Sequence, residues 1–230
     1  MNQDLQTPQA QAAYGRTSVL ATNSVIRNTY ILLALTLIFS AATAGFAMIT
    51  RAPMLNVWLI MIGYFGLMFM TRALRNSAWG ILSIFALTGF MGYTIGPVLN
   101  LYIANFSNGS ELVLYAAGST GAIFLALSAY ALSTRRDFSY LGGFITAGIL
   151  VAFIAAIANI FLHMAGLALV VSSMFVLLMC GYILYQTSAL INGGETNYIM
   201  ATVSLYVAIY NLFMSLLQIL GIFGGNSRSR

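Results

Sequence analysis

The sequence predicts an all-α integral membrane protein with seven transmembrane helices, and two observations support this fold class. Of the 230 residues, 60% are hydrophobic and only 6% are charged, whereas a soluble domain uses about a quarter of its residues as charges. The apolar residues also fall into seven runs, each close to the roughly 20 residues that cross about 30 Å of hydrocarbon. A soluble surface cannot be covered with so few charges, so the chain belongs in a bilayer.

The seven apolar runs lie at approximately residues 28–50, 54–71, 78–103, 110–133, 139–163, 166–188 and 199–223. Short separators place each helix antiparallel to its neighbour. Residues 1–26 are polar and lack the basic start and apolar core of a signal peptide. We predict a disordered cytoplasmic tail at 1–26 and a transmembrane domain at 27–225.

Orientation follows from the arginines, because basic loops stay on the cytoplasmic side of a membrane. Six arginines fall on the side of the amino terminus and three on the other; the six are Arg16, Arg27, Arg72, Arg75, Arg135 and Arg136. The amino terminus is therefore expected in the cytoplasm and the carboxyl terminus outside it. The net charge is +5, and we expect the arginines that carry it to interact with the membrane surface and not with nucleic acid.

The sequence argues against an enzyme. It has no lysine for a retinal Schiff base, and Asp4 and Asp137 lie outside the apolar runs, where they cannot form an intramembrane aspartyl pair. His163 ends an apolar run, and no GxSxG motif accompanies it. With Cys180 as the only cysteine, zinc sites of several Cys or His ligands are excluded. We expect no catalytic residue, cofactor or metal site.

Uncharged polar residues form a stripe on the last apolar run. Ser204, Ala208, Asn211, Ser215 and Gln218 are spaced 4, 3, 4 and 3 residues apart, which places them on one helix face. An unpaired amide facing lipid costs several kcal/mol, so this face must look into the bundle. Two interpretations stay open: hydrogen bonds between helices, each contributing about 0.6–2 kcal/mol, or the lining of a hydrated cavity or ion path.

The depth of the polar residues suggests two layers. Asn100, Asn159 and Gln218 are expected in an outer layer. An inner layer would hold Gln186, Thr187, Ser204 and Tyr206. Either layer would be a candidate polar core.

The third run contains small residues and a proline. Gly89, Gly92 and Gly96 allow close helix contact, and Pro97 should kink or break the helix because it lacks a backbone donor. Packing with a kink and a flexible gate are both compatible with this pattern.

Glu195 is the carboxylate nearest to the last run. Gly193 and Gly194 stop the preceding helix, and Thr196 or Asn197 should cap the next one, where a negative charge favours the helix dipole. Alternatively, Glu195 forms a cytoplasmic ionic latch or a weak cation site at the mouth of the bundle. The arginines available to such a latch are Arg72, Arg75, Arg135 and Arg136.

Three segments together resemble the Bax inhibitor-1 family in its bacterial branch. They are "GILS" with "TGFMGYTIGP" in the third run, Asn159 within "ANIFL", and "GGETNYIMATVSLYVAIYNLF" at the carboxyl end. The likeness extends over about residues 16–221. It implies a bacterial inner-membrane protein whose last helix is central and surrounded by the other six. It also implies two functional themes: modulation of an FtsH-type AAA membrane protease, and a pH-sensitive calcium leak.

This chain differs from the calcium-leak members of the family at two positions. The leak-forming relatives carry two aspartates that share a proton, and the resemblance places those positions at Gln186 and Ala208, which do not titrate. The protease theme fits better, because a cytoplasmic tail offers a protease a segment to grip. We therefore expect a non-enzymatic regulator that binds and restrains the protease and is itself a slow substrate through its tail. A calcium-leak or cation-sensing bundle, with Glu195 as its nearest carboxylate, remains the alternative.

Overall fold

The computed structural model describes residues 8–224, with side chains described from residue 24 onward. Seven helices make up this part of the chain: α1 (Pro8–Ile49), α2 (Val57–Leu74), α3 (Trp79–Asn105), α4 (Gly109–Thr134), α5 (Leu141–Leu162), α6 (Ala165–Ile191) and α7 (Tyr198–Gly224). All are long and apolar enough to cross a membrane, α1 through its part Ser24–Ile49. The predicted fold class is confirmed, and the spans begin and end within about four residues of the predicted runs.

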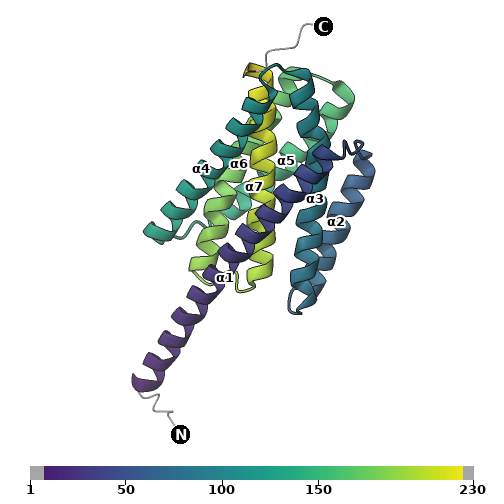
Figure 1. Cartoon of the computed structure of the whole chain (residues 1–230). Coiled ribbons are helices and arrows are strands. Elements are labelled where there is room, and N and C mark those ends of the chain that lie inside the picture. Colours follow the sequence, from purple (N-terminus) through teal and green to yellow (C-terminus); the bar gives the residue numbers. More distant parts are fainter. Residues whose placement is uncertain (1–7, 225–230) are drawn as a thin grey trace.

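The amino-terminal segment differs from the irregular tail that its composition suggested. From Pro8 onward it is part of α1, a helix of 42 residues that extends beyond the other helices (Figure 1). Proline is well accommodated at a first helical position, and the alanines and glutamines that follow have high helix propensity. Residues 1–7 of the predicted tail lie outside the described residues.

The last helix lies inside the bundle (Figure 1). It packs against α1, α3, α4 and α6, and Leu205 and Leu212 on it are fully buried. The expectation that six helices surround α7 needs correction, because α2 packs chiefly on α3 and α5 chiefly on α6. These two peripheral helices have few buried residues: Thr71 on α2, and Ile145 and Ala152 on α5.

Helices α1 and α3 approach each other closely at the predicted glycines. A Cβ added to Gly92 would collide with the carbonyl oxygen of Ser40, and one added to Gly96 would lie 2.5 Å from the Cβ of Ala47. The glycines therefore serve close helix contact, as expected. Pro97 lies within α3, which continues past it to Asn105, so of the predicted kink or break the break does not occur, and the kink stays a prediction.

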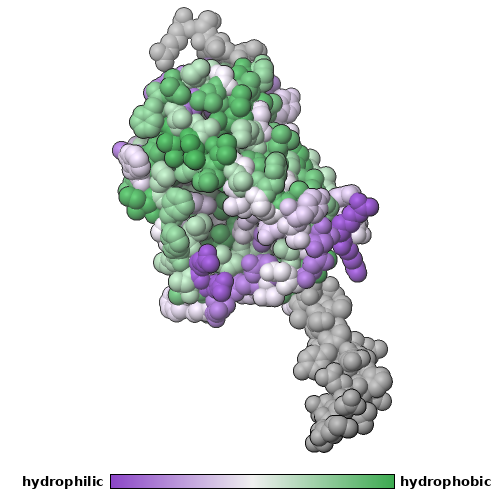
Figure 2. All heavy atoms as spheres, turned by 180° about the vertical axis from the view of Figure 1, so that it is seen from behind, coloured by the Kyte–Doolittle hydropathy of each residue, from purple (hydrophilic) through white to green (hydrophobic). Residues whose placement is uncertain are grey.

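The surface shows how the bundle fits a bilayer. Figure 2 shows hydrophobic residues over most of the face opposite to that of Figure 1, with hydrophilic residues at the end from which α1 projects. We call this the amino-terminal end of the bundle. It carries the loops α2–α3, α4–α5 and α6–α7 and their exposed arginines, so this end marks one boundary between membrane and water.

Candidate functional site

The predicted polar stripe of α7 makes contacts with α6 and with its own helix. The Ser172 hydroxyl on α6 donates to Gln218 Oε1 at 2.6 Å, and Ser204 lies near the hydroxyl of Tyr182, also on α6. The Asn211 amide donates to the carbonyl of Val207, one turn earlier. The bond between Ser172 and Gln218 is of the kind that the first interpretation of the stripe predicts, a hydrogen bond between helices. Ser215 is buried on the same helix.

The expected outer layer of amides divides into three separate contacts. Asn100 donates to the Met48 carbonyl near the end of α1 at 3.1 Å. Asn159 accepts from the Met164 backbone within the α5–α6 turn at 3.1 Å, and Gln218 pairs with α6 as described. Each amide thus serves a different neighbour, and no hydrogen bond joins them among the described residues.

Polar groups near the amino-terminal end gather where α1, α6 and α7 meet. The Tyr30 and Thr187 hydroxyls lie 3.5 Å apart, and Thr202 on α7 donates to the Thr29 carbonyl at 3.3 Å. Gln186 is buried with an exposed fraction of 5%. The Thr29 hydroxyl is buried and has no hydrogen-bond partner within the described part of the chain. Of the residues predicted for the inner layer, Thr187 takes part in these contacts, whereas Tyr206 bonds to Ser40 and Thr88; the layer itself stays a prediction.

Glu195 holds the backbone of its own loop. Its Oε1 accepts from the Asn197 amide N–H at 2.8 Å, and Asn197 Oδ1 accepts from the N–H groups of Ile199 and Met200 at 3.1 and 3.0 Å. Of the two predicted capping residues, Asn197 is therefore the N-cap of α7. Glu195 favours the cap geometry by fixing the residue that provides it.

The four arginines proposed for a latch, Arg72, Arg75, Arg135 and Arg136, all have exposed side chains. Their loops are instead joined to the ends of α6 and α7 by uncharged hydrogen bonds. Asn197 Nδ2 donates to the Arg75 carbonyl at 3.0 Å, and the Ser188 hydroxyl donates to the Arg136 carbonyl at 3.1 Å. Glu195 makes no ion pair with an arginine among the residues the structure describes.

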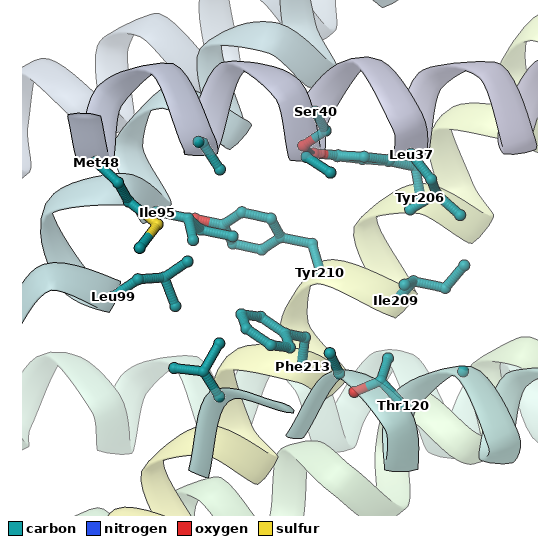
Figure 3. A pocket seen from close by; sticks show the side chains of 16 residues that line it. Leu37, Ser40, Met48, Ile95, Leu99, Thr120, Tyr206, Ile209, Tyr210 and Phe213 are labelled. Atoms are coloured by element: carbon teal, nitrogen blue, oxygen red, sulfur yellow. Dashed lines mark hydrogen bonds between the residues drawn. The ribbon is translucent and has the colours of Figure 1, made fainter. Parts of the chain in front are cut away.

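A groove of about 450 Å³ lies on the other side of α7, between α1, α3 and α4. We call it the lateral groove; its walls and floor include Ala41, Gly45, Ala117, Gly121, Tyr210 and Phe213. In Figure 3, Ser40 and Thr120 lie on opposite walls, and the aromatic rings of α7 lie between them. Because Ala41 and Ala117 are exposed, the groove reaches the lipid-facing surface.

The hydroxyl groups that line the lateral groove already have partners. Ser40 Oγ lies 2.6 Å from the Tyr206 hydroxyl, which donates to the Thr88 carbonyl at 3.2 Å. Thr120 donates to a carbonyl of its own helix, and the Tyr210 hydroxyl lies 3.5 Å from that of Thr94. A site without free polar groups holds water poorly, so the groove suits an apolar occupant and not an ion path.

The lateral groove was not anticipated from the sequence. Its signal was present as pairs of small residues four apart, Ala41 with Gly45 and Ala117 with Gly121. On helices that face each other across α7, such pairs leave space where larger side chains would fill it.

Residues 22–225 match the family model described as "Inhibitor of apoptosis-promoting Bax1". The chain belongs to the Bax inhibitor-1 family. Three relatives match this chain over nearly its whole length. An uncharacterized protein of Pseudomonas aeruginosa is 55% identical over 89% of this chain and 91% of its own length. A protein of Escherichia coli K12 named "Modulator of FtsH protease YccA" is 49% identical over 91% of this chain and 95% of its own length. An uncharacterized membrane protein of Vibrio cholerae is 40% identical over 96% of this chain and its own full length.

Within this member of the Bax inhibitor-1 family, the two positions expected to hold the paired aspartates are buried. Gln186 on α6 is 5% exposed and Ala208 on α7 is fully buried. An amide and a methyl group carry no charge at any pH, so this pair has no proton to share. In the described part of the chain, no three His, Cys, Asp or Glu side chains come together.

Proposed function

We propose that this chain is a non-enzymatic inner-membrane regulator that binds and restrains an FtsH-type AAA protease. The observation that carries the proposal is the similarity to the Escherichia coli protein named as a modulator of FtsH protease, which extends over 91% of this chain. A relative of equal identity from another Escherichia coli strain is named an inner membrane protein. A shared fold and close identity over the whole domain favour a shared partner.

The shape of α1 supports a second part of the proposal, that the chain is itself a slow substrate. Its amino-terminal portion extends beyond the bundle (Figure 1) and is the end expected in the cytoplasm from the arginine distribution, with the carboxyl terminus in the periplasm. A protease that pulls on this end meets the α1–α3 contact at Gly92 and Gly96, where the backbones pack closely. Close packing slows extraction, and a slowly extracted chain occupies the enzyme.

The experiment separates binding from degradation. Tagged full-length protein, a variant lacking residues 2–15, and a control with residues 2–15 in scrambled order are expressed in cells with an FtsH-type protease. Complex formation is measured by pull-down from solubilised membranes, and turnover by the half-life after synthesis stops. We expect all three to insert, the control to behave as the full-length chain, and the deletion to lose protease-dependent turnover.

The outcomes discriminate between contact modes. If the deletion variant still binds, the helices form the complex and the tail serves degradation. If it no longer binds, the tail is the contact. Unchanged turnover of the deletion variant refutes the slow-substrate mechanism, and the absence of the protease from every pull-down refutes the proposal as a whole.

A calcium leak is the alternative function, and the polar groups where α1, α6 and α7 meet are the observation that favours it. Glu195 is half-buried near this end of the bundle and would supply the nearest carboxylate. Liposomes that contain a calcium reporter test the idea with Glu195→Gln, and with Glu111→Gln at the opposite end of the bundle as control. A flux above that of empty vesicles, reduced only by Glu195→Gln, would support the leak; no flux would exclude it.

A further inference from the structure

The lateral groove has the length of one membrane leaflet. Its lining on α1 extends from Leu37 to Met48, which is about 16 Å at 1.5 Å per residue. Half of the roughly 30 Å hydrocarbon thickness is about 15 Å. Because the α1 span is Ser24–Ile49, the groove runs from the middle of the span to its end. On α4 it runs from Val113 to Gly121, again within one half of the helix.

The chemistry of the groove selects for hydrocarbon. Its four hydroxyl-bearing residues are hydrogen-bonded within the protein, as described above, and the remaining lining is aliphatic, aromatic or glycine. Its volume of about 450 Å³ lies within the roughly 300–1,000 Å³ of typical ligand pockets. An empty groove would leave its walls without contact partners, whereas a chain from the surrounding bilayer supplies them.

A positively charged residue follows the end of the groove lining on α1. Arg51 follows the lining residue Met48 by three residues, and its backbone N–H bonds to the Met48 carbonyl at 3.2 Å, so the chain folds back over the end of α1. The side chain of Arg51 is exposed, at the level where the headgroups of that leaflet lie. A guanidinium at this depth complements the phosphodiester of a phospholipid.

We propose that the lateral groove binds one acyl chain of a phospholipid from the leaflet at the carboxyl-terminal ends of α1 and α7, with Arg51 pairing with its phosphate. The small side chains of α1 and α4 then have a function of their own: they form the walls of a lipid site. This site is independent of the protease proposal.

Photolabelling tests the proposal on the full chain reconstituted in liposomes. The probe is a phosphatidylethanolamine with a diazirine on one acyl chain, and labelled peptides are identified by mass spectrometry. We expect adducts on residues 37–48 and 113–121 to exceed those on the peripheral helices α2 and α5 several-fold. Equal labelling of all lipid-facing helices would overturn the proposal.

A matched pair of glycine variants on α4 separates groove filling from general effects. A Cβ at Gly121 or at Gly118 meets no atom within 4 Å, so the backbone leaves room for a side chain at both positions, but only Gly121 lines the groove. Gly121→Leu should reduce groove labelling several-fold, and Gly118→Leu should leave it unchanged. Ala41→Leu on the opposite wall repeats the test should Gly121→Leu fold poorly. Labelling that persists in both filled variants would refute the site.

The headgroup is tested with two further probes. Arg51→Gln should reduce labelling by the phospholipid probe and leave labelling by a diazirine diacylglycerol, which has no phosphate, unaltered. Stronger labelling by a diazirine fatty acid than by the phospholipid would overturn the phospholipid as the occupant. An Arg51→Gln variant that binds the phospholipid probe as well as the parent would overturn the role of the phosphate.

Discussion

Substitution of Gly92 by alanine should destabilise the bundle at the contact between α1 and α3. The added methyl group would collide with the carbonyl of Ser40 and would lie 2.7 Å from Ser40 Oγ. The carbonyl belongs to the backbone of a helix and cannot rotate away. The two helices must therefore separate, or one of them must shift along the contact.

The size of the effect follows from three contributions. Overpacking of a close contact typically costs about 1–3 kcal/mol. Displacement of Ser40 breaks its 2.6 Å hydrogen bond to Tyr206, which adds about 1 kcal/mol. Alanine is favoured over glycine in a helix by about 0.5–1 kcal/mol, which offsets part of the loss. The free energy of unfolding should therefore fall by about 1–3.5 kcal/mol.

Unfolding in mixed micelles measures this change. Purified protein in a mild detergent is titrated with sodium dodecyl sulfate, and helix content is followed by circular dichroism. Gly45→Ala is the control, because Gly45 lies on α1 and a Cβ there meets no atom within 4 Å. We expect Gly45→Ala to be neutral or slightly stabilising. Equal transition midpoints for the two variants would show that α1 and α3 are not in close contact at Gly92.

The remaining predictions concern hydrogen bonds between helices and loops. Asn197→Ala removes the N-cap of α7 and the link to the Arg75 carbonyl, so it should cost more than the about 1 kcal/mol of a cap alone; Asn56→Ala, which removes only the cap of α2, is the control, and equal costs would contradict the loop link. A double-mutant cycle of Ser172→Ala and Gln218→Leu should give a coupling near 0.6 kcal/mol in the same unfolding assay, and additive effects would show that the two side chains do not interact.

The features that the sequence predicted correctly depend on local pattern. Helix spans follow from hydropathy averaged over about 20 residues, and this chain has sharp separators between its runs. The glycines of α3 were expected at a close contact because only residues without large side chains permit one. Asn197 was among the expected caps of α7 because its side chain bonds to the backbone two and three residues ahead. None of these inferences needs knowledge of which helix lies beside which.

The features that the sequence did not reveal depend on the arrangement of helices. The stripe from Ser204 to Gln218 had to face inward, but only the fold shows that its neighbour is α6. The lateral groove arises between α1 and α4, which are separated by two helices in the chain. Charge alone predicts an ionic latch at Glu195. In the structure the Glu195 carboxylate instead accepts a hydrogen bond from the backbone N–H of Asn197, two residues away. The polarity of the first residues predicts a disordered tail, whereas the helix propensity of the alanines and glutamines after Pro8 favours the helical start of α1.

The position of α7 has a consequence for how the protein is made. The helix that supplies partners to α1, α3, α4 and α6 follows all six other described helices in the chain, so those six are synthesised before it. During synthesis the Ser172 hydroxyl on α6 and the Ser40 hydroxyl on α1 have no amide or phenol from α7 to bond. The bundle can close only once α7 has been synthesised, and a chain truncated before Tyr198 would remain an open assembly for quality control to remove.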